Sequence, residues 1–109
     1  MSKFETVILF NPDLSNLIIE KEEKNITDNV ESSQGKIIST ENWGLRDLSY
    51  KISNYKKAFY KFYQIEINGS SIENLKKIMT QNEKILRHLF VKVENHQELP
   101  TKIVKNEEN

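Results

Sequence analysis

Four short segments of the chain are rich in aromatic and branched apolar residues, and successive side chains in each would point to opposite faces of a strand. In residues 4–10, alternation places Phe4, Ile8 and Phe10 on one face, and Asn11-Pro12 closes the segment. Alternation over this length is typical of a strand. Residues 36–43, 58–67 and 87–93 predict three further strands. The third strand should place Phe59, Lys61, Tyr63, Ile65 and Ile67 on one face, and Ala58, Tyr60, Phe62, Gln64 and Glu66 on the other.

Two other segments carry apolar residues at helical spacing. The first, residues 13–33, can be capped by Asp13 or Ser15, and Gly35 follows it where a left-handed residue is favoured. The second should begin with a capping box formed by Ser70 and Glu73, and end near residue 82. Residues 44–57 should contain a bend at Gly44, irregular or strand-like chain over residues 45–52, and a polar turn at residues 54–57.

The order strand, helix, strand, strand, helix, strand predicts an α+β fold. Two split β-α-β units form a ferredoxin-like sandwich, a four-stranded antiparallel sheet with both helices on one face. Residues 1–93 should form this single domain, and residues 94–109 a charged, mostly flexible C-terminal tail. The predicted core between helices and sheet contains Ile8, Ile26, Val30, Ile65, Ile67, Leu75, Met79, Leu89 and Val91.

Composition removes several classes of protein. The 109 residues contain no cysteine, and no apolar run approaches the ~20 residues that span a bilayer. We therefore expect a cytoplasmic protein without disulfides. His88 and His96 have no third ligand at a recognisable spacing, and three glycines form no phosphate loop. We accordingly expect no metal site, no cofactor, no catalytic residue and no small-molecule substrate.

Net charge bears on a possible nucleic-acid partner. Sixteen basic residues balance sixteen acidic ones. Proteins that hold nucleic acid alone usually carry a basic excess, because phosphate contacts supply much of the affinity. RNA binding by this chain would therefore need a local basic patch or a basic partner protein.

Four segments resemble one known family in order and separation. Residues 4–14 (FETVILFNPDL) resemble the opening strand and N-P turn of bacterial small-subunit ribosomal protein six. Residues 43–52 (WGLRDLSYKI) resemble the family signature W-G-x-R-x-L-A-Y-x-I. Residues 57–60 (KAFY) and 85–89 (ILRHL) resemble the entries to its third and fourth strands. Departures from the pattern are Asp47, Ser49 and Lys51, of which Asp47 could weaken a phosphate contact by Arg46.

The resemblance implies a structural constituent of the small ribosomal subunit and not an enzyme. Family members pack with small-subunit ribosomal protein eighteen, and the pair docks on the platform of the small-subunit ribosomal RNA. They are often neutral or acidic, which agrees with the charge of this chain. We expect a monomer when the chain is free.

Two sets of surface residues follow as candidates. The sheet face away from the helices should meet the protein partner through Val7, Leu9, Tyr60, Phe62 and Phe90. Basic residues at strand ends and turns should contact RNA phosphates, and these are Lys3, Arg46, Lys51, Lys56, Lys57, Arg87 and Lys92. Trp43 is expected to anchor the bend at Gly44, although its indole could also stack on a base.

Two alternative functions share the predicted strand order. A single-stranded RNA-recognition module would stack bases on third-strand aromatics, which residues 57–63 faintly resemble, but Tyr60 stands where that motif has a small residue. A small-molecule or catalytic ferredoxin-like domain of the acylphosphatase kind would need an arginine-bearing loop after the first strand. The loop here is Asn11-Pro12-Asp13, which has no positive charge.

Overall fold

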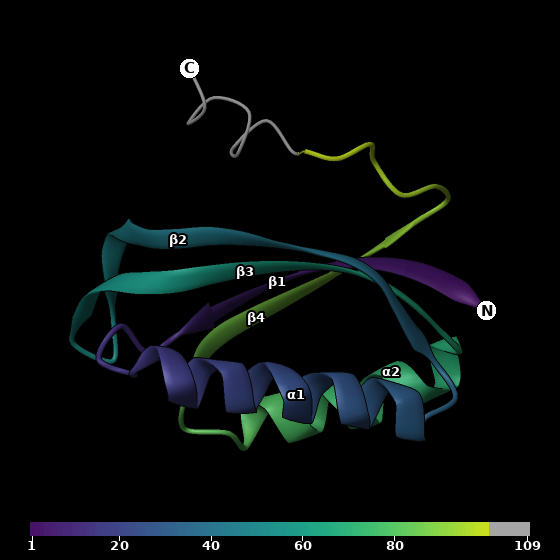
Figure 1. The fold of residues 1–109 in the computed structure, drawn as a ribbon, viewed down its shortest axis with the longest axis horizontal. Coiled ribbons are helices and arrows are strands. Elements are labelled where there is room, and N and C mark those ends of the chain that lie inside the picture. Colours follow the sequence, from purple (N-terminus) through teal and green to yellow (C-terminus); the bar gives the residue numbers. More distant parts are fainter. Residues whose placement is uncertain (101–109) are drawn as a thin grey trace.

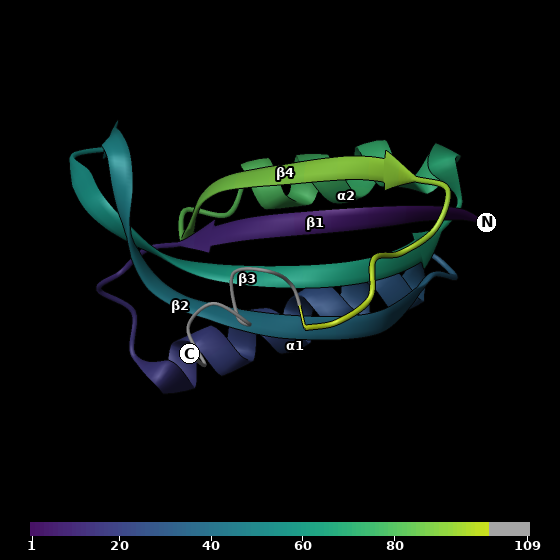
Figure 2. The same ribbon diagram turned by 90° about the horizontal axis from the view of Figure 1, so that it is seen from above.

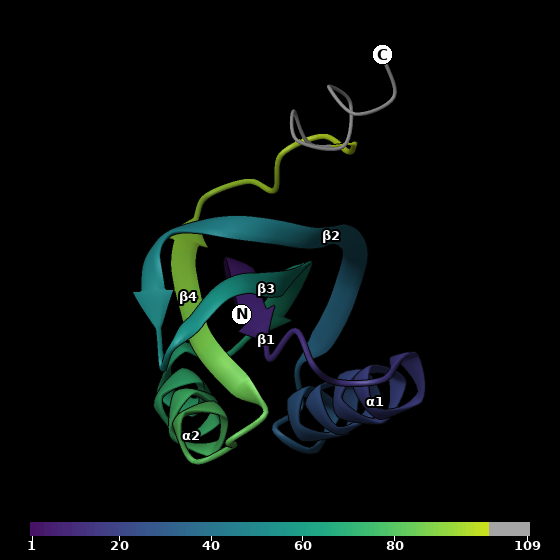
Figure 3. The same cartoon turned by 90° about the vertical axis from the view of Figure 1, so that its left-hand side faces the viewer.

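The computed structural model describes residues 1–100 and confirms the predicted fold. Its elements are β1 (Ser2–Phe10), α1 (Asn16–Ser32), β2 (Lys36–Ile52), β3 (Tyr55–Ile67), α2 (Gly69–Thr80) and β4 (Ile85–Val93). The strands form one antiparallel sheet in the order β2-β3-β1-β4. Figures 1 and 3 show both helices on one face of the sheet, with α1 towards β2 and α2 towards β4.

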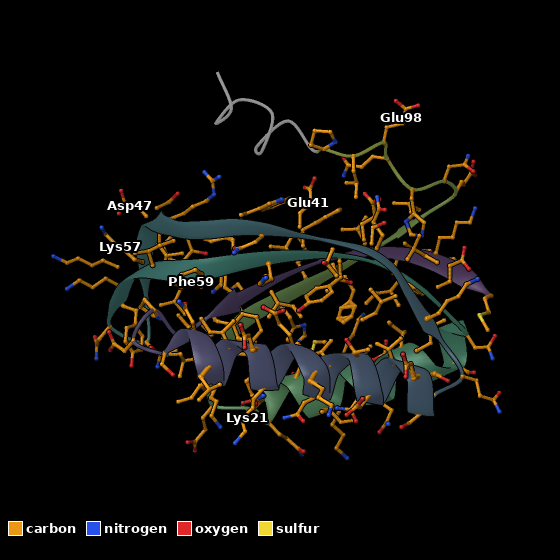
Figure 4. The ribbon with its side chains drawn as sticks, in the orientation of Figure 1. Lys21, Glu41, Asp47, Lys57, Phe59 and Glu98 are labelled. Atoms are coloured by element: carbon orange, nitrogen blue, oxygen red, sulfur yellow. The ribbon has the colours of Figure 1, made fainter. Side chains whose placement is uncertain are left out.

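The core lies between that face and the two helices. The central strands β1 and β3 direct Phe4, Ile8, Tyr63 and Ile65 into it, as alternation predicts. Phe59 points from the sheet towards the helices (Figure 4). The cluster of buried residues is Phe4, Ile8, Phe10, Ile26, Val30, Tyr63, Ile65, Ile67, Ile72, Leu75, Met79 and Ile85.

The predicted core was wrong at Leu89 and Val91. Both side chains lie on the opposite face of the sheet, 58% and 47% exposed. The pairing of β4 places Leu89 opposite Val7 and Phe90 opposite Thr6, which faces the helices. Leu89, Phe90 and Val91 are all apolar, so the sequence does not show which of them face the core. An error of one residue moves every side chain of the strand to the opposite face of the sheet. The phase of β4 was therefore decided by its pairing with β1.

The β2–β3 hairpin is longer than predicted. Its second strand begins at Tyr55, and the turn consists of Ser53 and Asn54, which have φ of 49° and 70°. Two central residues with positive φ are what a tight two-residue hairpin turn requires. Irregularities in the pairing with β3 allow β2 to continue through the predicted bend, where Gly44 has φ of 77°.

The helix ends differ in detail from the prediction. Ser15 caps α1 by accepting a hydrogen bond from the Ile18 amide at 3.3 Å. The left-handed residue after α1 is Gln34, not Gly35. Gly35 is needed for space instead, since a Cβ there would lie 2.8 Å from the Glu66 carbonyl oxygen. The predicted capping box is absent, because α2 begins after Asn68 and has no side-chain cap.

Candidate functional site

The sheet face away from the helices is the candidate site, and the chain itself covers part of it. The Trp43 indole stacks on Phe62, with ring centroids 5.1 Å apart and planes 8° from parallel. Phe62 is consequently only 2% exposed. The indole nitrogen donates a hydrogen bond to Glu41 at 2.9 Å. Trp43 thus packs as the predicted anchor, and a partner could reach Phe62 only by displacing it.

The segment after β4 covers a second part of this face. Figure 2 shows residues 94–100 crossing the sheet from β4 towards β2. The Gln97 amide and side chain donate hydrogen bonds to the Glu5 carboxylate at 3.0 and 2.8 Å. Gln64 donates to the same carboxylate at 3.0 Å and to the Gln97 carbonyl at 2.9 Å. The beginning of the predicted tail therefore contacts the sheet, whereas residues 101–109 lie outside the described residues.

Glu5 is the charged centre of this contact. Burial by itself would raise the pKa of its carboxyl group, because the charged form loses hydration. Hydrogen bonds from Gln97 and Gln64, together with His96, outweigh that effect and hold the pKa below its ordinary value. His96 Nδ1 lies 3.4 Å from a Glu5 oxygen. The Glu5 carboxylate thus accepts the hydrogen bonds that connect the segment to the sheet.

An apolar strip remains exposed on this face. Leu89 and Val91 of β4 are about half exposed, and Val7 of β1 lies opposite Leu89. The prediction that Phe90 belongs to this face was wrong. Phe90 packs against the core on the helix side, with the Lys76 ammonium 6.0 Å from its ring centroid. Of the other predicted partner contacts, Leu9 is 8% exposed, and Tyr60 is half-buried.

The predicted RNA contacts fall at two ends of the sheet. Arg46, Lys51, Lys56 and Lys57 belong to the β2–β3 hairpin, and Arg87 lies near the start of β4 at the same end. Lys3 and Lys92 lie towards the other end of the sheet, opposite Val93 and Phe4 respectively. Pairing with Phe4 places Lys92 on the helix side of its strand. The structure therefore groups five of the seven predicted residues.

Several of these basic residues have partners within the protein. Lys57 Nζ lies 3.8 Å from Asp47 Oδ1, an exposed ion pair at the end of the sheet away from Glu98 (Figure 4). Such a pair contributes little to stability. Arg46 Nε donates a hydrogen bond to the Trp43 carbonyl at 2.9 Å. Lys57 and Arg46 therefore both have a partner within the hairpin.

The most informative residue that sequence analysis did not select is Tyr50. It is 63% exposed, and its hydroxyl accepts a hydrogen bond from Arg87 at 2.7 Å. The guanidinium carbon lies 5.6 Å from the ring centroid. The position of Tyr50 in the WGLRDLSYKI segment was the one sequence feature that could have indicated it. Its contact with Arg87 could not be predicted, because the two residues come from the opposite edge strands β2 and β4. Leu89 and Val91 were missed as surface residues because the phase of β4 was wrong.

Within residues 1–100 no three His, Asp or Glu side chains gather as ligands for a metal ion. In that part of the chain no helix has the length and apolar character needed to cross a membrane.

The order of the strands and helices defines the fold class of this protein. It is a ferredoxin-like sandwich with an exposed apolar strip on β4 and basic residues at the β2–β3 hairpin end of the sheet. Residues 3–92 match the family model described as Ribosomal protein S6. This chain belongs to the ribosomal protein S6 family.

Individual relatives agree with this assignment. The chain is 38% and 36% identical to small ribosomal subunit protein bS6 of Rickettsia prowazekii and Rickettsia felis, over 98% of its own length and 88% of each relative. It is 18% identical to the crystal structure of 30S ribosomal protein S6 from Thermotoga maritima, with a TM-score of 0.80, covering 84% of this chain and 87% of that one. The structural likeness supports the fold.

Family membership confirms the resemblance found in the sequence. The family is a structural component of the small ribosomal subunit. The protein accordingly belongs to the cytoplasm as part of the ribosome.

Proposed function

We propose that this chain is a non-enzymatic protein that binds platform ribosomal RNA of the small subunit together with small-subunit ribosomal protein eighteen. One observation carries the proposal: a neutral chain has an exposed apolar strip along β4 and a separate group of basic residues at the β2–β3 hairpin end of the sheet. The strip suits a protein partner, and the hairpin suits phosphate.

The protein partner docks on the strip formed by Val7, Leu89 and Val91, with Tyr60 nearby in the sheet. Exposed apolar surface of this kind is typical of interaction sites. The partner supplies most of the positive charge for RNA binding, because this chain has no net excess. The free chain is a monomer that binds RNA weakly.

The RNA backbone contacts the hairpin end. Residues 44–60 contain four basic residues and one acidic residue, so this segment is strongly positive within a neutral chain. Arg46, Lys51, Lys56, Lys57 and Arg87 provide the phosphate contacts there. Lys3 and Lys92 are separate, more distant contacts, because they lie towards the other end of the sheet.

A free-standing RNA-recognition module is less well supported. Such a module stacks bases on aromatic side chains of its central strands. Phe62, the central aromatic side chain of β3 on the exposed face, is already covered by Trp43. The surface available for binding lies at the hairpin end and along β4 instead.

Paired titrations test this division of the surface. Leu89→Glu should abolish pairing with ribosomal protein eighteen, because an unpaired charge in a partly dry interface is costly. Leu17→Glu is the matched control, since Leu17 is 69% exposed on α1. Lys56→Ala should preserve pairing, weaken RNA binding by the assembled pair and lower its salt slope by about one.

The RNA measurement uses a platform fragment of small-subunit ribosomal RNA. Lys21→Ala on α1, which projects on the side away from the exposed sheet face, is the charge control (Figure 4). Normal pairing by Leu89→Glu, or equal effects of Lys56→Ala and Lys21→Ala, would contradict the proposal. Submicromolar RNA affinity of the chain alone at physiological salt would contradict the need for a partner.

A further inference from the structure

The end of the β2–β3 hairpin curls over the exposed sheet face and encloses a recess. Figures 2 and 3 show the hairpin turning from its own edge of the sheet towards β4. Tyr50 of β2 thereby meets Arg87 of β4, although two strands lie between β2 and β4 in the sheet. The recess beneath has a volume of about 130 Å³, and Leu9, Leu48 and Tyr60 form much of its lining.

We propose that this recess binds one unpaired RNA base, stacked on the Tyr50 ring beside Arg87. The inference rests on the proposed RNA contact and makes it more specific. The hairpin end would bind an unpaired base in a single strand or bulge, in addition to contacting phosphates.

The composition of the recess fits a base. Exposed aromatic rings and arginine guanidinium planes are the groups on which proteins stack unpaired bases. The Tyr50 ring is 63% exposed and is oriented by the hydrogen bond from Arg87. Leu9, Leu48 and Tyr60 provide apolar surface that the edges of the bound base could contact. The recess volume of about 130 Å³ is large enough to hold several waters, which a small planar group would displace.

The surrounding charge favours RNA over a protein side chain as the occupant. Lys51 follows Tyr50 directly, and Lys56 lies just beyond the turn that closes the hairpin. Both belong to the same hairpin end as the recess, whose own lining includes Arg87, so positive charge for a phosphate backbone lies close to a partly apolar recess. The apolar strip of Leu89 and Val91 is adjacent along β4, so a protein partner has its own surface. Base binding would leave that strip free.

A fluorescent oligonucleotide tests the recess without the protein partner. The probe is a single-stranded RNA decamer with one 2-aminopurine, and the same decamer in a duplex is the comparison. We expect the protein to change the fluorescence of the single strand and not that of the duplex, whose bases are already stacked. Tyr50→Leu should weaken binding of the single strand by about five- to tenfold, the low end of the range for loss of one stacked base.

Three matched variants separate stacking from charge. Tyr50→Phe keeps the ring for stacking but loses the hydroxyl that accepts the Arg87 hydrogen bond, so it should weaken binding less than Tyr50→Leu does. Arg87→Lys keeps the charge but loses the planar guanidinium that orients the ring, so it should weaken the fluorescence change. Lys56→Ala should weaken binding and reduce its salt slope, yet reach the same fluorescence change at saturation.

The outcomes distinguish the recess from the proposed function. If Tyr50→Leu binds the decamer normally while Lys56→Ala still weakens binding, the base site is wrong and phosphate binding stands. If Tyr50→Leu impairs pairing with ribosomal protein eighteen and not RNA binding, the recess holds a protein side chain, which also overturns the inference. If the assembled pair of unaltered proteins fails to bind platform RNA, the proposed function itself fails.

Discussion

Truncation of one side chain on each face of the sheet tests the observed phase of the strands. Ile65 is fully buried and lies between Phe4 of β1 and Ile37 of β2 in the sheet. Ile65→Ala removes buried methyl and methylene groups and leaves a cavity under the helices. Deletions of this kind reduce the free energy of unfolding by about 2–5 kcal/mol. Full burial of Ile65 within the packed cluster favours the upper half of that range.

Leu89→Ala is the matched change on the exposed face. The Leu89 residue is 58% exposed, so less than half of its surface is removed from water on folding. Full burial of a leucine side chain contributes about 1.5–3 kcal/mol, and the partial burial here predicts a loss of roughly 1 kcal/mol or less. No closed cavity forms, because solvent reaches the site.

Urea denaturation followed by circular dichroism measures both effects. Equal slopes of free energy against urea for the two variants and the unaltered protein would show that only stability has changed. A Leu89→Ala loss as large as that of Ile65→Ala would refute the observed phase of β4. A loss below about 1 kcal/mol for Ile65→Ala would refute the position of the core.

Three further changes probe the packing and the Glu5 contact. Gly35→Ala should lower the free energy of unfolding by about 1–3 kcal/mol, since its Cβ would crowd the Glu66 carbonyl oxygen, and urea denaturation checks it. Trp43→Ala should expose Phe62 and reduce stability by roughly 3 kcal/mol, measured against a Leu45→Ala control on the same strand. Because the pKa of Glu5 is lowered by folding, its contribution is present above its unfolded value near 4.5 and is lost as pH falls through the folded value. The unaltered protein should therefore lose more stability than Glu5→Gln on acidification below about pH 5 in parallel urea titrations, and identical pH profiles would exclude a role for the carboxylate.

Local sequence determined most of the architecture. Alternation of side-chain direction in β1 and β3 correctly assigned Ile8 and Ile65 to the core, because successive residues of a strand point to opposite faces of the sheet. The order of strands and helices then left the ferredoxin-like sandwich as the predicted fold, and four short motifs indicated the family. Four of the seven predicted RNA contacts gather at one end because they belong to one hairpin, whose residues are close in sequence as well as in space. Arg87 joins them only through the pairing of β4 with β1.

Tertiary structure decided the features that depend on residues far apart in the chain. The phase of β4 follows from its pairing with β1, so Phe90 faces the helices while Leu89 and Val91 remain exposed. Sequence alone could not show that Tyr50 reaches Arg87 across the sheet, or that Gln97 docks on Glu5 from 92 positions away. Such contacts depend on strand register and on the curl of the hairpin, which are set by the packing of the whole domain. Hydrophobic periodicity reports which face of an element is buried, whereas only the assembled sheet determines which side chains from different elements meet.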